Sequence, residues 1–200
     1  MPQGISRPPL TARCGKRWPT PRGPPIITPL DKSLAPFSSD PMTEPRTPSY
    51  SRIETRYILA PHQVNALGTA FGGVIMSWID TVAAMTAQRH CHGVVVTVGI
   101  DKISFEAPIN IGDHVILKAS VNYVGKTSME VGVLVSKENP MTGEEARTTT
   151  AYLTFVQLDE NGVPAGVAKL VAETNEDKRR YENAKLRAQA RKELLERIKK

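Results

Sequence analysis

The feature that most constrains the fold is a run of four β-rich segments that follows one apolar segment of helical length. Residues 74–90 are predominantly apolar, and the four segments rich in β-branched residues are 94–105, 114–124, 128–138 and 146–158. The segments are separated by "APINIGD", "GKT" and "NPMTGEE", which are short and rich in turn residues, as hairpins require. A further short strand is expected within "TRYILAP". This order predicts an α+β domain in which a curled antiparallel β-sheet wraps around one central α-helix.

The two ends of the chain differ from this body. Residues 1–41 contain ten of the sixteen prolines, so residues 1–45 are expected to form a disordered, Pro-rich extension, with Met42 as an alternative start. The domain itself is expected over residues 46–170. Residues 171–200 predict a charged helical tail whose apolar residues are too sparse to add much to a core.

Charge and composition exclude several classes of function. The net charge of +6 comes from the ends of the chain. Residues 1–41 hold six Lys/Arg and two acidic residues, and residues 172–200 hold ten Lys/Arg and six acidic residues. The remainder holds ten basic and twelve acidic residues, so no nucleic-acid partner is expected. No apolar run is long enough to span a bilayer or to serve as a secretory signal, so no membrane association is expected. Cys14 and Cys91 lie in different contexts, which suits a reducing, cytoplasmic location.

Asp80 is the most unusual residue of the helical segment, because it ends the apolar run "VIMSWI". A charged side chain is seldom buried without a partner. Asp80 follows Gly73 by seven residues, which places the two on about the same helix face and about 10 Å apart along the axis. The glycines would let a substrate approach the unpaired N–H groups of the helix start. We interpret Asp80 as a catalytic carboxylate; the alternatives are a hydrogen-bonded structural aspartate and a simple tight turn at "FGG".

Five motifs in order carry a family resemblance. They are "N-x-x-G-x-x-FGG-x-x-M-x-x-x-D", "AQRHC", "VVTV-x-I-D-x-I-x-F", "GD-x-V" and "GKTSMEV". Together they resemble the hotdog-fold acyl-CoA thioesterases, in particular the broad-range bacterial and brain-type acyl-CoA hydrolases, over about Arg56 to Asp159. The resemblance implies a hotdog fold and hydrolysis of acyl-CoA to a free carboxylic acid and CoA. It also implies no metal, no cofactor other than the CoA of the substrate, and a homo-oligomer with a dimer as the minimal unit and a hexamer as the expected state.

The resemblance also implies the catalytic residues. Asn65 and Asp80 correspond to the family's catalytic pair, with Asp80 of one protomer meeting Asn65 of its neighbour. Asp80 would act as general base on water or as a nucleophile that forms an anhydride, and the sequence leaves both open. Asn65 would orient the water or the carbonyl. The N–H of Gly73 would polarise the thioester carbonyl as its oxyanion develops.

Two further groups resemble the family's CoA-binding positions. Lys126, Thr127 and Ser128 form the turn "GKTS", where a lysine and two hydroxyl groups could meet a phosphate; the alternative is a polar hairpin turn. Arg89 and His90 correspond to positions near the nucleotide; the alternative is capping of the helix C-terminus by cations.

Other interpretations fit the residues less well. The spacing of "HCH" at 90–92 is too tight for an ordinary zinc site, and Cys91 is expected to be a packed, reduced thiol. A hotdog dehydratase would need a different His–acid motif. A non-catalytic acyl-CoA sensor remains the alternative function, although the Pro-rich arm cannot be an adjoining helix-turn-helix. A basic-tailed interaction protein would leave Asp80 unexplained.

Overall fold

The computed structural model describes residues 44–198, and five strands in it form one antiparallel sheet. The strands lie in the order β1-β3-β4-β5-β2 across the sheet. Their bounds are β1 Ile53–Ile58, β2 Val94–Phe105, β3 His114–Val124, β4 Ser128–Glu138 and β5 Glu145–Leu158. Among the residues that the structure describes, β1 and β2 are therefore the two edges of the sheet, and β2 pairs with β5 alone.

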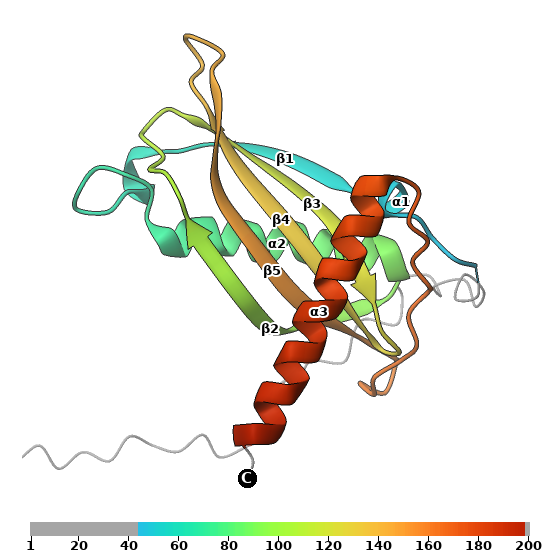
Figure 1. Cartoon of the computed structure of the whole chain (residues 1–200). Coiled ribbons are helices and arrows are strands. Elements are labelled where there is room, and N and C mark those ends of the chain that lie inside the picture. The colour runs from blue at the N-terminus through green and yellow to red at the C-terminus, as the bar shows by residue number, and fades with distance from the viewer. Residues whose placement is uncertain (1–43, 199–200) are drawn as a thin grey trace, which may run out of the picture. The chain divides into compact units, whose positions relative to one another are not determined.

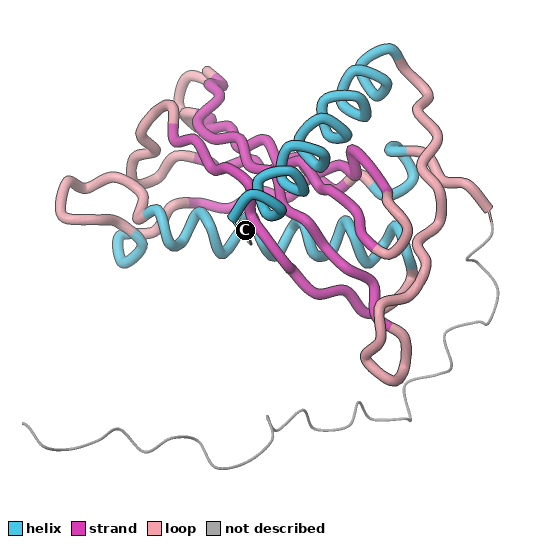
Figure 2. Tube along the Cα trace, turned by 60° about the horizontal axis from the view of Figure 1, so that its bottom comes forward, coloured by secondary structure: helices cyan, strands magenta, loops and turns pink. Residues whose placement is uncertain are grey.

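Two long helices cover the sheet from opposite faces (Figures 1 and 2). Helix α2 spans Gly72–Cys91 and α3 spans Asn175–Ile198, while α1 (Pro48–Ser51) and the 3₁₀ helix η1 (Pro61–Gln63) are short. The curled antiparallel sheet around α2 confirms the expected hotdog fold. The expected helix at 74–90 agrees with α2 to within two residues, and the expected N-terminal strand lies slightly earlier in the chain, at β1.

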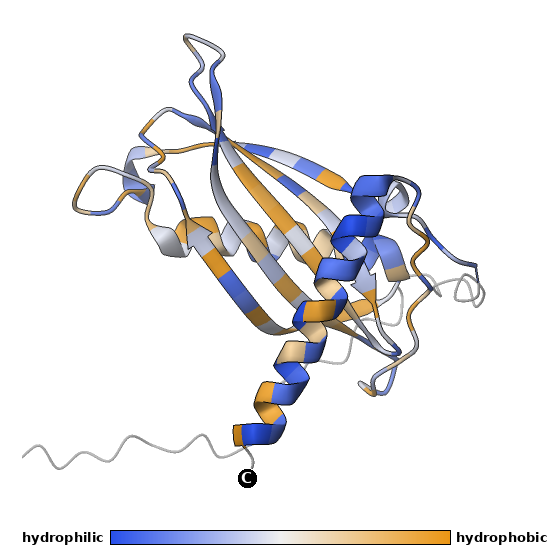
Figure 3. Ribbon diagram, in the orientation of Figure 1, coloured by the Kyte–Doolittle hydropathy of each residue, from blue (hydrophilic) through white to orange (hydrophobic). Residues whose placement is uncertain are grey.

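The core lies between α2 and the concave face of the sheet. Helix α2 buries an i, i+3, i+4 stripe, as an amphipathic helix does when it packs on one face. The strands contribute alternate residues, because successive side chains point to opposite faces. The principal buried members are Ile75, Ile79, Val82, Ala83 and Ala87 from α2, and Val115, Leu117, Val131, Val133, Leu153 and Phe155 from the strands. Figure 3 shows the corresponding apolar bands along the strands.

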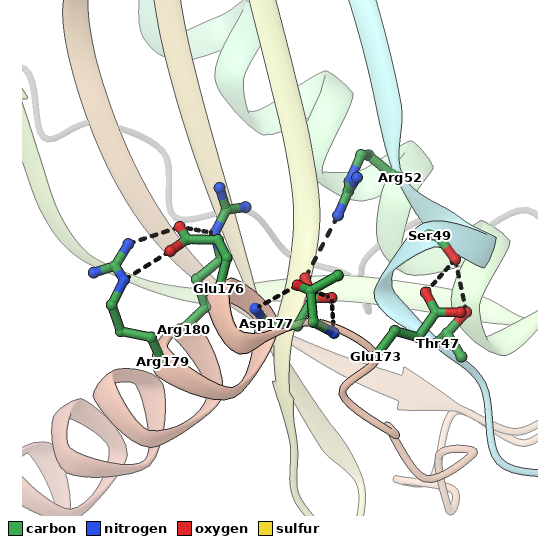
Figure 4. Close-up of polar contacts among 9 residues, drawn as sticks. Thr47, Ser49, Arg52, Glu173, Glu176, Asp177, Arg179 and Arg180 are labelled. Atoms are coloured by element: carbon green, nitrogen blue, oxygen red, sulfur yellow. Dashed lines mark hydrogen bonds and ion pairs between the residues drawn. The ribbon is translucent and has the colours of Figure 1, made fainter.

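Helix α3 begins with a polar cap that ties it to the start of the domain. The Thr174 hydroxyl accepts a hydrogen bond from the Asp177 N–H at 3.0 Å, and Asp177 accepts from the Thr174 N–H at 3.1 Å. Asp177 also forms an ion pair with Arg52 at 3.5 Å (Figure 4). Glu176 pairs with Arg179 and Arg180 one turn later, and these guanidinium groups hold the pKa of its carboxyl at about 2.

The rest of α3 contacts the sheet mainly through polar and aromatic side chains. Its buried residues are Asp177 and Ala184. The expectation that this helix adds little to the core is thus confirmed for the described residues, yet the helix packs across the convex face of the sheet. Neither α2 nor α3 is long and apolar enough to cross a membrane, and no other helix within residues 44–198 is. The disorder expected for residues 1–45 lies almost entirely outside the described residues.

Candidate functional site

Asp80 lies at the border of the buried stripe of α2 and faces the edge strand β2. Its side chain is half-buried, and its Oδ1 accepts a hydrogen bond of 2.8 Å from the hydroxyl of Thr97. No other described side chain bonds this carboxylate. The second oxygen is therefore available to a water molecule or a substrate. Sequence reasoning missed Thr97, although it is a polar residue within the apolar run "VVVTV" and so carried the same kind of signal as Asp80.

The loop before α2 is closed by the side chain of Asn65. Its Oδ1 accepts from the N–H of Leu67 at 2.9 Å and of Thr69 at 3.3 Å, while its Nδ2 donates to the Thr69 hydroxyl at 3.0 Å. This arrangement is an Asx turn, in which the side chain satisfies backbone donors that lack strand or helix partners. Gly68 completes the turn with a φ of +76°, a conformation that favours glycine. Asn65 is thereby held at a fixed point near the start of α2.

Gly73 is the second residue of α2, so its N–H belongs to the first turn and has no acceptor within the helix. The N-cap residue Phe71 supplies no side-chain cap. A Cβ at position 73 would lie 2.5 Å from Cε1 of Phe71, so the exposed ring of Phe71 packs directly over this glycine. The start of α2 therefore presents backbone N–H groups and a favourable dipole to an anion or a developing oxyanion.

The predicted catalytic residues do not meet within one chain. Among the described residues, no hydrogen bond joins Asn65 or Gly73 to Asp80, which lies two turns further along α2. Helix α2 runs antiparallel to β2. The start of α2 lies at the end of β2, because a Cβ at Gly72 would lie 3.6 Å from the ring of Phe105. The end of α2 lies at the start of β2, because β2 begins three residues after α2 ends. Asn65 and Gly73 thus lie at one end of β2, with Asp80 and Thr97 nearer its middle.

The turn between β3 and β4 lies at the other end of β2, near the C-terminus of α2. The Thr127 carbonyl accepts a hydrogen bond of 3.1 Å from the N–H of Gln157, which pairs with Val95 of β2. Lys126 is exposed and Ser128 is half-buried. Arg89 is exposed near the end of α2 and has no ion pair among the described residues. The exposed cations of this end are available to a phosphate-bearing ligand.

His90, by contrast, is fully buried. Its Nε2 lies 3.1 Å from the carbonyl oxygen of Ala168, and its Nδ1 lies 3.3 Å from the hydroxyl of Ser51. The backbone carbonyl of His90 accepts a hydrogen bond from Arg46. Both ring nitrogens are engaged inside the chain, so His90 cannot contact a nucleotide directly. We therefore remove it from the CoA-binding positions and assign it a structural role in joining α1, α2 and the segment before α3.

The buried position of His90 predicts a pH-dependent stability. Burial lowers the pKa of this imidazole below its ordinary value of 6.5, because desolvation disfavours the charged form. Below pH 6.5 the unfolded chain binds a proton that the folded chain does not yet bind. The free energy of unfolding should therefore fall as the pH drops below 6.5, by up to about 1.4 kcal/mol per pH unit. Denaturant titrations between pH 5 and 8 measure this slope. His90→Asn should reduce this slope and leave the part that comes from His92, whose pKa is also lowered by burial. The same change at the exposed His62 should leave the slope as it is. An unchanged slope in the His90 variant would contradict the assignment.

The same region gives no sign of a metal site. No group of three or more potential metal ligands occurs within residues 44–198. Cys91 is buried and forms no disulfide, and burial raises the pKa of its thiol. The expectation of a packed, free thiol at this position is confirmed; Cys14 lies outside the described residues.

The edge strand β2 exposes a row of large apolar side chains. Val94, Val96, Val98, Ile100 and Phe105 are each between 39% and 56% exposed, although they belong to a twelve-residue strand. A long, apolar, unpaired edge is a template for pairing with another strand. Because Asp80 and Thr97 lie beside this edge, a strand paired there would bring a second chain to the candidate site.

Comparisons with known proteins agree with this geometry. A family model described as the thioesterase superfamily matches residues 67–144. An uncharacterised acyl-CoA thioester hydrolase of Bacillus subtilis is 45% identical over 132 residues, covering 66% of this chain and 77% of that protein. The cytosolic acyl coenzyme A thioester hydrolase of Rattus norvegicus is 34% identical over 144 residues, which span only 38% of that longer protein.

Solved structures show the same fold. The acyl-CoA hydrolase of Staphylococcus aureus, solved with butyryl coenzyme A, coenzyme A and coenzyme A disulfide, superposes with a TM-score of 0.73 at 34% identity over 77% of this chain and 94% of that one. A hexameric acyl-CoA thioesterase superposes with a TM-score of 0.74 at 39% sequence identity. The match covers 76% of this chain and 97% of that one.

Variants of the Staphylococcus aureus enzyme match the candidate site in spacing. They carry alanine in place of an asparagine, an aspartate and a threonine, which follow one another at intervals of 15 and 17 residues. Asn65, Asp80 and Thr97 follow one another at the same intervals. The candidate site of this chain therefore has the same three residue types, at the same spacing, as the three residues that were replaced in that enzyme.

Proposed function

Because the chain belongs to the thioesterase superfamily, we propose that it hydrolyses acyl-CoA thioesters to a free carboxylic acid and CoA, with Asp80 as the reacting carboxylate. The observation that carries the proposal is the Asp80–Thr97 pair: a half-buried carboxylate, held at one oxygen by a hydroxyl, lies beside an unpaired strand edge. A thiolate is a good leaving group, so the reaction can proceed without a metal.

Asp80 supports two routes with the same overall balance. As a general base it takes a proton from water, the resulting hydroxide attacks the thioester carbonyl, and the tetrahedral intermediate expels the CoA thiolate. As a nucleophile it attacks the carbonyl itself, expels the thiolate and forms an acyl–aspartyl anhydride that water then hydrolyses. In both routes Thr97 fixes the orientation of the carboxylate, and the N–H of Gly73 stabilises the oxyanion.

One turnover with excess enzyme in ¹⁸O-labelled water can detect the anhydride route. The base route places one labelled oxygen in the product acid. If water opens the anhydride at the Asp80 carbonyl, an unlabelled oxygen of Asp80 enters the product of the first turnover and the label remains on the enzyme. Label on the peptide that contains Asp80, found by mass spectrometry together with unlabelled product acid, would therefore establish the anhydride route. Label in the acid alone is the outcome of the base route and also of an anhydride that water opens at the acyl carbonyl.

The complete site requires a second copy of the chain. A two-fold axis perpendicular to the sheet would pair β2 with the partner's β2 in antiparallel fashion. Since α2 runs antiparallel to β2, this pairing sets the start of α2 in one protomer beside the middle and end of α2 in the other. Asn65 and Gly73 of one chain would then complete the site around Asp80 and Thr97 of its partner. The hexameric state of a similar thioesterase supports a dimer that assembles further into a homohexamer.

The CoA moiety would extend from this site toward the far end of β2. Arg89 and Lys126 are the exposed cations there, and the hydroxyl groups of Thr127 and Ser128 lie in the adjacent turn. Their charge and hydrogen-bonding capacity fit the phosphates of the nucleotide. The free thiol at Cys91 suits a cytoplasmic, reducing environment.

The test is release of CoA measured across thioesters from acetyl- to palmitoyl-CoA, with a thiol reagent as the readout. A hydrolase releases free thiol in many turnovers for at least one chain length. A non-catalytic acyl-CoA-binding protein would instead bind the thioesters, as isothermal titration measures, and release none. The second outcome would replace the hydrolase by the sensor function.

A further inference from the structure

The C-terminal part of α3 carries an apolar surface that residues 44–198 of its own chain leave exposed. Leu194, Leu195 and Ile198 are 58%, 52% and 71% exposed. They lie in the last turns of a helix that is otherwise strongly polar (Figure 3). In Figure 1 these turns extend past β2 at the edge of the sheet.

The earlier contacts of α3 follow the order of the strands. Asp177 pairs with Arg52, which directly precedes β1, and Tyr181 packs against Tyr123 of β3 at 5.3 Å between ring centroids. Three further contacts continue across the sheet. Arg187 binds Glu130 of β4 and lies over the Tyr152 ring of β5. Arg191 pairs with Asp101 of β2. The helix thus crosses the sheet from one edge to the other.

Distances agree with this crossing. From Asp177 to Arg191 the helix rises about 21 Å at 1.5 Å per residue. The four strand spacings from β1 to β2 amount to about 19 Å. The seven residues from Arg191 to Ile198 add about 10 Å, which corresponds to two more strands. The described part of one chain supplies no strand at that position.

The exposed residues lie on the helix face that meets the sheet. Ala184, Arg187 and Arg191 form this face, and Leu195 and Ile198 continue it at the same i, i+3, i+4 spacing. Leu194 lies three residues after Arg191 and borders the same face. Leu186, in contrast, is 64% exposed but lies about 100° around the helix from Arg187. The sheet-facing surface of α3 is therefore longer than the sheet that it covers.

We propose that the end of α3 is a strap that packs on the convex face of a second copy of this chain. The inference rests on the β2-edge dimer of the proposed function, in which the partner's β2 and β5 continue the sheet at the required position. Val95 packs toward the core and Thr97 bonds to α2, so the alternating Val94 and Val96 point to the α3 side, where they are 41% and 39% exposed. In the partner these valines supply an apolar surface for Leu194, Leu195 and Ile198.

A photo-crosslinking amino acid identifies what covers this surface. Leu195→benzoylphenylalanine, irradiated in the full chain, should give a covalent dimer whose acceptor peptide lies in β2, β5 or α3 of the second chain. Leu186→benzoylphenylalanine is the matched control on the opposite side of the same helix and should give only background. An acceptor peptide within the same chain, including residues 1–43, or cross-linking no stronger than the control would overturn the proposal.

Assembly gives an independent measure. Leu194→Gln with Ile198→Gln should raise the dimer dissociation constant about tenfold or more in sedimentation equilibrium, whereas Leu186→Gln should not change it. Unchanged assembly in the double variant would contradict the strap. Acyl-CoA hydrolysis by the wild-type chain, measured in the same preparation, separates the strap from the proposed function. If the wild type is an active dimer and the double variant assembles equally well, only the strap is contradicted. If the wild type is active as a monomer, the site shared between two chains is contradicted.

Discussion

Replacing Asp80 by asparagine should lower kcat by about 10²-fold or more, because the amide can neither accept the proton of water nor attack the thioester. The side chains are nearly isosteric, and the amide oxygen can still accept the Thr97 hydrogen bond. We therefore expect the variant to keep the stability and oligomeric state of the wild type. Steady-state hydrolysis of the best acyl-CoA substrate, normalised to folded protein, measures the effect.

A matched change elsewhere isolates the role of this carboxylate. Asp159→Asn makes the same replacement in a turn whose backbone N–H groups, from Asn161 and Val163, bond to Asp159 Oδ1. This control should keep nearly full activity. If Asp80→Asn instead lost stability while its turnover per folded molecule stayed near the wild-type value, Asp80 would be a structural residue.

Replacing Arg187 by alanine should destabilise the fold by about 3 kcal/mol, at the lower end of the range for breaking a buried ion pair. Arg187 binds Glu130 in a bidentate manner, with N–O distances of 3.1 and 2.6 Å, and only 1% of the Glu130 side chain is exposed. The alanine would leave this carboxylate buried with the single hydrogen bond from Asn122, at 3.3 Å. Chemical denaturation at neutral pH measures the loss.

Two controls define the cause of that loss. Arg179→Ala removes an exposed arginine from the same helix, where the ion pair with Glu176 is screened by solvent, and should cost much less stability than Arg187→Ala. Arg187→Met combined with Glu130→Gln removes both charges and should recover much of the stability. Equal losses for Arg187→Ala and Arg179→Ala would mean that the pair with Glu130 does not fix α3 to the sheet.

Much of the fold could be predicted because its signals are local. The apolar stripe of α2 and the β-branched runs with short turns between them specify one helix and four strands without tertiary information. The strand order could not be read from these patterns, since nothing local places β2 beside β5 at the edge. The path of α3 was also missed, because Arg187 and Arg191 anchor it through charge rather than through an apolar stripe.

The candidate site was predictable in part for the same reason. An aspartate after "VIMSWI" breaks a local pattern, so Asp80 is visible in the sequence. Its contact with Thr97 joins two elements 17 residues apart and depends on the sheet. The burial of His90 depends on Ser51 and Ala168, both distant in the chain, so an exposed cation at a helix end and a core histidine look alike in the sequence.

The measurement that tests the shared site most directly combines two inactive variants. Asp80→Asn and Asn65→Ala chains each form dimers in which both sites lack one residue. In a mixed dimer, one site receives Asp80 from one chain and Asn65 from the other, while the second site lacks both. Random pairing makes about half of the dimers mixed, each with one good site of two, so co-refolded equimolar chains should recover about a quarter of the wild-type activity. No recovery, with mixed dimers demonstrated by mass spectrometry, would mean that Asp80 and Asn65 do not act together across the protomer boundary.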